Sequence, residues 1–356
     1  MRVIIIGSDR NLFDIGSAVR LRTLSYGALF SELRIVVFTH RGHNIFSREK
    51  IAENIWLYPT NSRNRWWYIY DTVRIARSVI RTSSKEETWI VSTQDPFEAG
   101  FAGWLVTCRT KSRLHLQIHT DLMSTSFVFG SLLNLFRFFI AQFLLPRAKS
   151  VRVVSERIRR SICGVTQAPI TVLPIFVDTK KFNMLIRPHP DVPKKLLWMG
   201  RFEKEKDPMT ALRAFIEARH KGFDVSLIMA GDGKLRTGLV AYTKHRNIAD
   251  RVSFPGWVAP GEIMSNVDCL LVTSRYEGYG VVIIEALAAG LPVISTDVGV
   301  AREAGAVIAL GGVSHTLIEW LHNGERIGVL HYNPYADEAE YLMRYKKALS
   351  AGEDIT

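Results

Sequence analysis

Short apolar runs alternate with longer segments whose apolar positions recur every three or four residues along the first half of the chain. The short runs predict buried β-strands, and the longer periodic segments predict amphipathic helices. The expected strands are Val3–Gly7, Arg34–Thr39, Ile55–Pro59, Trp89–Thr93, Leu114–His119, Val151–Val154 and Ile170–Leu173. The expected helices lie near 16–31, 66–81, 97–107, 128–145 and 156–162. This alternation is typical of a doubly wound α/β domain.

The pattern breaks around Pro174–Pro193, where Pro174, Pro188, Pro190 and Pro193 lie close together and indicate a linker. A second alternating set follows, with expected strands at Lys195–Met199, Val225–Ala230, Val252–Phe254, Cys269–Val272 and Val293–Ser295. Asp207 and Pro208 are expected to start the helix after the first of these strands, as N-cap and first-turn proline. A chain of 356 residues exceeds the size of one hydrophobic core. We therefore expect two α/β domains, 1–175 and 176–334, and a final helical segment, 335–356.

Composition describes an ordinary folded protein, with 47% apolar and 22% charged residues. The three cysteines, Cys108, Cys163 and Cys269, are far apart and odd in number, so neither a disulfide framework nor a metal site is expected. Their use fits a reducing cytoplasm best. The apolar run at the start is too short for a signal peptide and is interpreted as the first strand.

The net charge of +12 comes entirely from the first half of the chain. Residues 1–175 hold 24 Lys and Arg against 12 Asp and Glu, whereas residues 176–356 hold 22 of each. Such a surplus suggests an anionic partner, namely a phospholipid surface, a lipid-linked phosphate or a nucleic acid. Solubility alone explains it equally well. No nucleic-acid recognition motif is visible, so a nucleic acid is not expected.

Two segments of the first half carry features of a membrane surface. Arg74, Arg77 and Arg81 share one face of the helix expected after Trp66-Trp67. Residues 127–145 form the most apolar stretch, but polar residues interrupt it and it lies between two expected strands, so a spanning helix is not expected. We expect it to be partly core and partly in contact with the bilayer surface. For the arginine face the alternative is a solvated basic surface over a packed aromatic core, and for residues 127–145 it is a pure core.

The stretch from Ser274 to Pro292 carries the most specific chemistry in the chain. A loop, Glu277–Gly280, follows an expected strand and leads into a short helix that holds Glu285. Ligands of open parallel sheets bind at this carboxyl edge of the strands. Arg201 and Lys206 occupy the corresponding loop of another strand, where two cations could hold a diphosphate as a leaving group without a metal. A solvated charged loop is the simpler alternative.

Two candidates come from the first half. His119 ends an expected strand and could serve as an acid, a base or a hydrogen-bond donor, although a lone histidine is more often structural. Gly16 and Ser17 open a helix whose free N–H groups could face a phosphate or a sugar, or they only ease a tight turn. The loop is not GxGxxG and no acidic residue closes the second strand, which disfavours a dehydrogenase.

Three motifs together resemble the signature of retaining glycosyltransferase family 4. They are Gly200-Arg201 followed by Lys206, Gly231-Asp232-Gly233, and Glu277 with seven residues before Glu285. The resemblance implies the GT-B fold: two facing Rossmann-like domains, the first for the acceptor, the second for a nucleotide-sugar donor, and a final helix that packs back on the first. It is strongest over 195–304 and weaker over 1–175. The first loop lacks the family's double glycine, and the segment after Gly299 is abbreviated.

The resemblance also implies roles for individual residues. The donor diphosphate would bind Arg201 and Lys206, together with backbone N–H groups of Gly278, Tyr279, Gly280 and Val281. Glu285 would accept hydrogen bonds from the ribose, and Glu277 would face the anomeric carbon of the transferred sugar. Gly256, Trp257 and Val258 would meet the base, His119 would lie at the catalytic centre, and Gly16 and Ser17 would form the loop between donor and acceptor.

The implied reaction is transfer of a hexosyl unit from a UDP- or GDP-sugar with retained configuration, with no metal and no further cofactor. The expected acceptor is a glycan or a lipid-linked molecule in cell-surface polysaccharide or glycolipid synthesis. Together with the basic first half, this predicts a cytoplasmic protein held peripherally on the inner face of the plasma membrane. Two alternatives have the same fold: a sugar-nucleotide epimerase and a catalytically silent binding protein.

Overall fold

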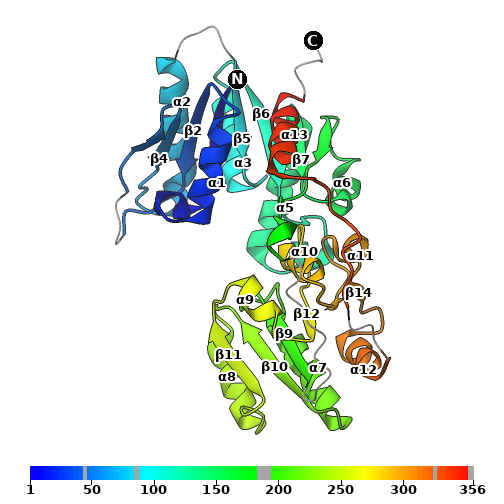
Figure 1. The fold of residues 1–356 in the computed structure, drawn as a ribbon. Coiled ribbons are helices and arrows are strands. Elements are labelled where there is room, and N and C mark those ends of the chain that lie inside the picture. Colours follow the sequence, from blue (N-terminus) through cyan, green and yellow to red (C-terminus); the bar gives the residue numbers. More distant parts are fainter. Residues whose placement is uncertain (43–45, 84–87, 183–193, 324–326, 352–356) are drawn as a thin grey trace. The chain divides into compact units, whose positions relative to one another are not determined.

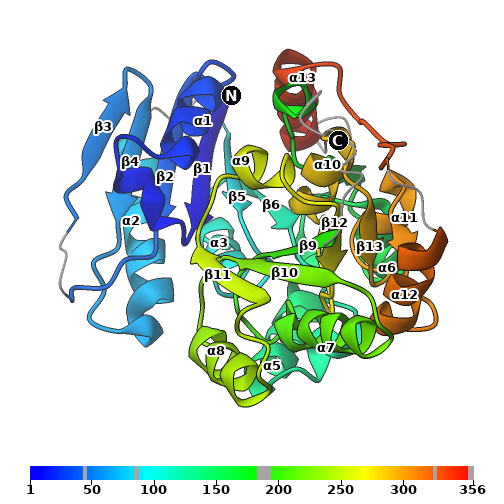
Figure 2. The ribbon, with the colours of Figure 1, turned by 60° about the horizontal axis from the view of Figure 1, so that its bottom comes forward.

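The computed structural model describes residues 1–42, 46–83, 88–182, 194–323 and 327–351. It divides into two compact units, Met1–Pro174 with Glu338–Thr356 and Ile175–Asp337, each built on one sheet (Figures 1 and 2). The boundary between the two units lies between residues 174 and 175. The boundary predicted from the sequence is one residue later, between 175 and 176. Three prolines of the expected linker, Pro188, Pro190 and Pro193, lie outside the described residues.

The sheet of the first unit has eight strands in the order β3-β4-β2-β1-β5-β6-β7-β8, all paired in parallel except β3 with β4. Every strand expected there is present, and β3 is an additional one. The expected runs miss β3 because it is a short edge strand with charged residues and no apolar run. The strands are β1 (Arg2–Gly7), β2 (Glu32–Val37), β3 (Glu49–Ala52), β4 (Ile55–Pro59), β5 (Trp89–Thr93), β6 (Ser112–Ile118), β7 (Ser150–Val153) and β8 (Ile170–Val172).

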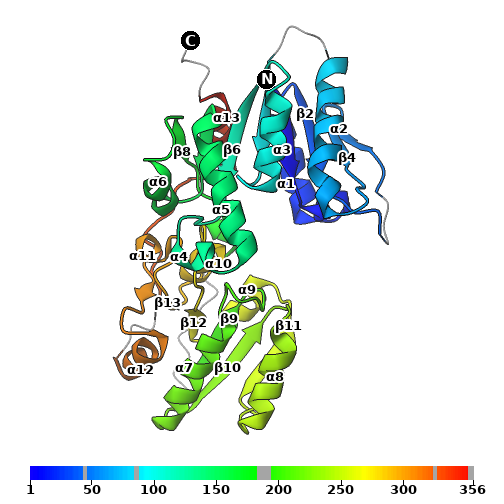
Figure 3. The same cartoon turned by 180° about the vertical axis from the view of Figure 1, so that it is seen from behind.

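Helices cover both faces of this sheet. Those of the first unit are α1 (Ala18–Gly27), α2 (Tyr68–Thr82), α3 (Glu98–Thr107), α4 (Thr125–Val128), α5 (Leu132–Leu144), α6 (Glu156–Ile162) and α13 (Glu338–Ser350). On one face α2 packs beside α3, and α3 packs beside α5 (Figure 3). Their buried side chains form one core with the central strands, including Ala76, Ala99 and Val106 against Ile4 and Val91. The all-apolar strands of the sequence are thus the ones buried between two helical layers.

The C-terminal helix α13 belongs to the first unit although 163 residues of the second unit separate it from the rest. Tyr345 stacks on Tyr26 of α1 at 5.0 Å between ring centroids. The hydroxyls of Tyr26 and Tyr341 are hydrogen-bonded at 3.1 Å, and Arg152 of β7 donates to Tyr341 at 3.2 Å. Two tyrosines at helical spacing therefore fix α13 on the sheet of the first unit.

The sheet of the second unit has six parallel strands in the order β11-β10-β9-β12-β13-β14. Its core forms around Trp198, Phe202 and Phe215. The strands are β9 (Lys194–Met199), β10 (Val225–Ala230), β11 (Val252–Gly256), β12 (Cys269–Val272), β13 (Val293–Ser295) and β14 (Val307–Ile308). The helices are α7 (Pro208–His220), α8 (Arg236–His245), α9 (Pro260–Met264), α10 (Val281–Ala288), α11 (Ala301–Ala304) and α12 (Val313–Asn323).

One local expectation in this unit is wrong. Asp207 does occupy the N-cap position of α7, but its backbone is left-handed (φ 44°) and its side chain caps no amide. The carboxylate instead accepts a hydrogen bond from Arg275 Nε at 3.2 Å, and the amide of Thr210 binds the Asp207 carbonyl at 3.1 Å. Arg275, 68 residues away in the chain, thus binds the side chain that the local sequence pattern predicts to cap the helix.

Both sheets contain a point at which the winding direction reverses. In the first unit the chain runs from β1 outward to β2 and β4, and then returns to β5 on the other side of β1. In the second unit it runs from β9 to β10 and β11, and then returns to β12 beside β9. Loops that leave the carboxyl ends of two such neighbouring strands diverge and leave a ligand site between them. The loops after β9 and β12 are therefore the place to search for a donor site.

Candidate functional site

Close backbone contacts join the loops after β9, β10 and β11 into one wall. The amide of Gly200 donates to the Ala230 carbonyl at 3.0 Å, and the amide of Gly231 donates to the Gly256 carbonyl at 2.7 Å. Gly231 has a φ of +125°, and a Cβ there would collide with the Gly200 carbonyl. A glycine at position 231 is thus needed for the two backbones to touch.

The loop after β12 is fastened to the same wall. Thr273 Oγ1 donates to the carbonyls of Lys206 and Asp207 at 3.0 and 2.8 Å, and it accepts from Trp198 Nε1 at 3.0 Å. The amide of Arg275 donates to the Glu205 carbonyl at 2.8 Å. The loops that hold the two parts of the motif therefore form one connected structure at the sheet edge.

Lys206 and Glu277 form an ion pair across these loops. The sequence predicted separate roles for them, Lys206 at the diphosphate and Glu277 at the sugar. Ser274 Oγ donates a second hydrogen bond to Glu277 Oε1 at 2.7 Å. Both charged side chains are largely buried, 22% and 13% exposed. A ligand phosphate at Lys206 would compete with the carboxylate of Glu277 for the same ammonium group.

Arg201 lies in the same loop as Lys206, but its ion pair is exposed. Its side chain is 62% exposed and donates from Nη2 to Glu205 Oε1 at 3.0 Å. An exposed pair of this kind is weak, and a phosphate could displace it at little cost. Arg201 is therefore available for an anion, whereas Lys206 already has a partner.

Four backbone amides, those of Gly278, Tyr279, Gly280 and Val281, have no hydrogen-bond acceptor within the described residues. They lie where the loop enters α10, and Gly280 has the left-handed φ of +92° that aims this turn. The Tyr279 carbonyl accepts from the amide of Val300 at 2.9 Å, which holds the turn in place. Unpaired amides at a helix N-terminus attract an anion through their partial positive charge.

Glu285 lies on α10, half-buried, and has no hydrogen-bond or ion-pair partner in the described part of the chain. Burial raises the pKa of its carboxyl to about 7. A carboxylate placed in a poorly hydrated position without donors costs free energy of folding. Hydroxyl donors from a ligand would satisfy it, which is the property required of a ribose-binding residue.

Two aromatic side chains flank these groups. Trp257 follows β11 and is 64% exposed, so its indole face is open for stacking on a planar group. The ring of Tyr279 is buried, and its hydroxyl has no hydrogen-bond partner within the described residues. Burial raises the pKa of this phenol, so it stays protonated. The sequence reasoning used only the backbone of Tyr279, and this unpaired hydroxyl is an additional group.

His119 directly follows β6 in the first unit. Burial and the positive charges of Arg152 and Arg22 lower its pKa to about 3, so the imidazole is neutral at pH 7. Its Nε2 lies 3.3 Å from Gln117 Oε1, which also accepts from Arg152 Nη1 at 2.8 Å. Gln117 Nε2 donates to Ser92 Oγ at 2.8 Å, which leaves Oε1 as the acceptor. The proton of His119 is therefore on Nε2, and Nδ1 is a hydrogen-bond acceptor.

The loop at Gly16 and Ser17 differs from expectation. The amide of Gly16 donates to Asp14 Oδ1 and that of Ser17 to the Asp14 carbonyl, both at 3.2 Å. Ser17 Oγ accepts from the amide of Arg20 at 3.2 Å and thereby caps α1. Both amides expected to be free for a phosphate are thus already bonded, because a nearby aspartate supplies the acceptor.

Sequence reasoning missed a carboxylate at the reversal point of the first sheet. Asp95 follows β5, next to Gln94, which packs against Gly7 at the end of β1. Its Oδ1 accepts from the amides of Phe97 and Ala99 at 2.8 and 3.2 Å, and burial raises its pKa to about 6. An acidic residue two positions after the strand expected at Trp89–Thr93 was a signal that could have found it.

The described residues contain no group of three or more His, Cys, Asp or Glu side chains that could hold a metal ion. That the reaction needs no metal stays a prediction. Among the helices that the structure describes, none is both long and apolar enough to cross a membrane.

Residues 180–306 match the family model of glycosyl transferases group 1. The matched segment contains every donor-side residue predicted from the sequence. Glycogen synthase of Mycobacterium tuberculosis is 29% identical over 144 residues, which cover 40% of this chain and 35% of the relative. Lipopolysaccharide 1,6-galactosyltransferase of Escherichia coli is 31% identical over 141 residues, 38% of each chain. The chain spans less than half the length of these curated relatives.

Solved structures match almost the whole chain. Sucrose-phosphate synthase of Thermosynechococcus elongatus aligns with a TM-score of 0.72 and 17% identity over 99% of this chain and 98% of its own. HepE of Anabaena, in complex with UDP and glucose, aligns with a TM-score of 0.70 and 15% identity over 98% and 99%. At such identities the likeness concerns the fold alone. It confirms the expected fold class, GT-B with two Rossmann-like domains.

Proposed function

We propose that this protein is a retaining glycosyltransferase of family 4 that moves a hexosyl unit from a nucleotide-diphosphate sugar to a glycan or lipid-linked acceptor. The observation that carries the proposal is the convergence, at one sheet edge, of groups that match each part of such a donor. Four free amides and two cations lie on loops that are bonded to each other, and the unpaired carboxylate of Glu285 lies on the helix that follows. They all fall inside the segment that matches the glycosyl transferase family model.

The donor end of the site follows from these groups. The ribose hydroxyls donate to Glu285, the diphosphate binds the amides of Gly278–Val281 with Arg201 and Lys206, and the base meets Gly256–Val258 with Trp257 as a stacking surface. The bond from the anomeric carbon to the diphosphate breaks with its electron pair on the diphosphate. The positive groups stabilise that developing charge, so no metal is needed for this step.

The sugar end follows from Glu277 and His119. Glu277 accepts from the sugar hydroxyls and faces the anomeric carbon, where the bond to the acceptor oxygen forms and the acceptor hydroxyl gives its proton to the departing diphosphate. His119, neutral at pH 7, cannot protonate a leaving group, so its role is to accept a hydrogen bond through Nδ1. Gly16 and Ser17 contribute to the loop between donor and acceptor only after their bonds to Asp14 are exchanged.

The function is tested by turnover with defined donors. UDP- and GDP-sugars are incubated with the protein and a lipid-linked or glycan acceptor, and free nucleotide diphosphate is measured. We expect release of one nucleotide, with at least tenfold acceleration by a suitable acceptor, and raised thermal stability with UDP or GDP alone. Conversion of the donor into an isomeric sugar nucleotide, or acceptor-independent release of the nucleotide together with an isomerised free sugar, supports the epimerase. Stabilisation without any turnover across the panel supports the silent binding protein.

Contact with an anionic membrane surface is the second part of the proposal, with the inner face of the plasma membrane as the location. It is supported by the basic surplus of residues 1–175 and by an exposed apolar face on α5. That face consists of Leu132, Leu133, Phe136, Phe139 and Phe143. At its end the guanidinium of Arg147 lies 3.7 Å from the Phe143 ring centroid. Apolar side chains beside cations are typical of helices that lie in a bilayer interface.

Removing aromatic rings from this α5 face should weaken membrane binding without unfolding the protein. We expect Phe136→Ser with Phe139→Ser to reduce co-sedimentation with phosphatidylglycerol vesicles about tenfold or more, because each ring contributes roughly 1.5–3 kcal/mol when it enters the interface. Both rings are more than half exposed, so the unfolding midpoint should stay unchanged. The matched control is Met343→Ser, an exposed apolar residue on α13. Equal sedimentation of the wild type with neutral vesicles at high salt would exclude the electrostatic part.

A further inference from the structure

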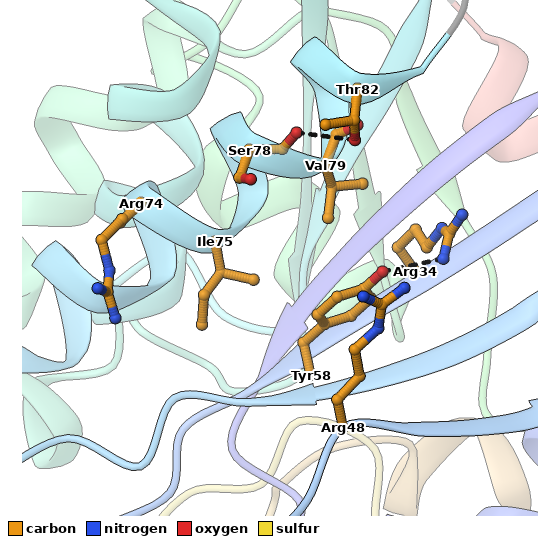
Figure 4. A pocket seen from close by; sticks show the side chains of 8 residues that line it. All are labelled: Arg34, Arg48, Tyr58, Arg74, Ile75, Ser78, Val79 and Thr82. Carbon is orange, nitrogen blue, oxygen red and sulfur yellow. Dashed lines mark hydrogen bonds between the residues drawn. The ribbon is translucent and has the colours of Figure 1, made fainter.

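The first unit contains a second candidate site, which His119 and Gly16 do not line. A cavity of about 580 Å³ lies between α2 and the strands β2 and β4 (Figure 4). Its lining includes Arg34 near the start of β2 and Thr82 at the end of α2. Neither His119 nor Gly16 lines it, and strands β1 and β5 lie between β2 and β6, the strand that His119 follows. The cavity is therefore separate from the proposed catalytic groups.

The positive side of the cavity is built around the ring of Tyr58. Arg34 Nη1 donates to the Tyr58 hydroxyl at 2.9 Å, and its guanidinium lies 3.4 Å from the centroid of Trp56. Glu32 pairs with Arg34 and balances its charge. Arg34 is thus a fixed donor group, only 14% exposed, in the wall of the cavity.

Arg48 supplies the uncompensated charge. Its guanidinium lies 4.8 Å from the Tyr58 ring centroid, and Figure 4 shows Arg48 beside the ring and Arg34 at its hydroxyl end. Arg48 has no acidic partner among the described residues, and none of the described residues that line the cavity carries a carboxylate. A guanidinium stacked on an aromatic ring keeps its N–H groups free for an oxyanion.

The opposite wall is the C-terminal half of α2 and is mostly apolar. Ile75 and Val79 point into the cavity, and Ser78 lies beside them with a hydroxyl that has no hydrogen-bond partner in the described part of the chain (Figure 4). Arg74 stands at the far rim, where it pairs loosely with Asp71 at 3.6 Å. The cavity thus offers guanidinium groups on one side and aliphatic surface on the other.

We propose that this cavity binds a phosphate-bearing amphiphile, with the phosphate at Arg48 and the apolar part against Ile75 and Val79. The guanidinium group of arginine binds phosphate oxygens well. The aliphatic wall gains nothing from a fully hydrated anion, but it can bury the apolar part of an amphiphile. A lipid source is favoured by position, because α2, α3 and α5 form one layer on the same face of the sheet. The exposed apolar face of α5 therefore belongs to the layer that also borders the cavity.

The test uses calorimetric titration of the whole protein with two probes, dihexanoyl phosphatidylglycerol below its micelle concentration and inorganic phosphate. We expect Arg48→Ala and Ser78→Glu each to weaken binding of the lipid at least tenfold. Ser78 is exposed, so the new carboxylate repels the phosphate without entering the core. Arg160→Ala, which removes the same charge from an exposed residue of α6, should leave the lipid affinity unchanged.

Each outcome decides the proposal. If inorganic phosphate binds as tightly as the lipid, the site takes a soluble phosphate and the amphiphile is excluded. No heat with either probe, or an equal loss in Arg160→Ala, overturns the site altogether. UDP affinity and the unfolding midpoint should be the same in Arg48→Ala and the wild type, which separates this site from the proposed donor site. A failure here leaves the glycosyltransferase proposal intact.

Discussion

Glu285→Gln should weaken UDP or GDP binding about 100-fold and, at pH 8, make the protein more stable. The carboxylate has no partner in the described residues, and in the proposed function two ribose hydroxyls supply the donors it lacks. Hydrogen bonds to a charged group contribute about 1.5–3 kcal/mol each, and an amide oxygen replaces them poorly. The same absence of partners means that the folded protein loses nothing when the charge is removed.

The stability gain follows from the direction of the pKa shift. Burial raises the carboxyl pKa from 4.5 to about 7, so the folded state holds a proton that the unfolded state has already released between these values. Its stabilising contribution is complete below pH 4.5 and is lost as pH rises through 7. Above pH 7 the ionised carboxylate costs roughly 2–3 kcal/mol, which the glutamine avoids. Thermal unfolding at pH 5 and pH 8 measures the difference, and it should appear only at pH 8.

The affinity for the nucleotide should rise with pH, whereas the contribution of Glu285 to stability falls with pH. The ribose hydroxyls favour the ionised carboxylate, so binding lowers its pKa and releases a proton near pH 7. The affinity of the wild type for UDP or GDP should rise from pH 6 to pH 8. This rise should be larger than the rise in Glu285→Gln, where only the ionisation of the phosphate contributes. Glu303→Gln, the same change at an exposed position of the second unit, should follow the wild type in both experiments. Equal pH profiles for wild type and Glu285→Gln would refute the ribose assignment.

The fold and the donor edge were accessible from the sequence because their signals are local. Buried parallel strands read as apolar runs, and glycines such as Gly231 stand where two loop backbones touch. The edge strand β3 has no comparable run, and β14 has only two residues of the apolar run 306–310 in strand conformation, so both were missed. The local sequence pattern thus predicts those strands that are buried between two layers of helices.

Side-chain partners were not accessible, because they depend on residues far apart in the chain. Asp207 is a plausible helix cap by pattern, but Arg275 takes its carboxylate. The amides of Gly16 and Ser17 look free until the fold of the loop brings Asp14 to them. Lys206 and Glu277 had been given separate tasks, and only the structure brings them together across 71 residues. These partners change which charges a ligand would meet.

The Lys206–Glu277 pair should respond with opposite signs when either charge is removed. Lys206→Met is expected to weaken nucleotide diphosphate binding about 100-fold, because the phosphate loses a cation in a poorly hydrated site. Glu277→Gln should leave that affinity unchanged or improve it severalfold, since Lys206 is released from its carboxylate. The same variant should lose at least 99% of sugar transfer, because the group proposed to contact the sugar is gone. Calorimetry with UDP or GDP and turnover with the sugar donor measure the two effects separately.

Two comparisons make this prediction decisive. Lys206→Met leaves the carboxylate of Glu277, which is only 13% exposed, without its cation, so the unfolding midpoint of this variant should fall. The double variant Lys206→Met with Glu277→Gln should regain the lost stability but not the diphosphate binding. Asp224→Asn breaks a matched but exposed pair with Arg251 in the same unit, and should change neither binding nor turnover. If Glu277→Gln weakened UDP or GDP binding as much as Lys206→Met, the carboxylate would itself bind the nucleotide. The two residues would then be one binding unit, and the division between a phosphate residue and a sugar residue would be wrong.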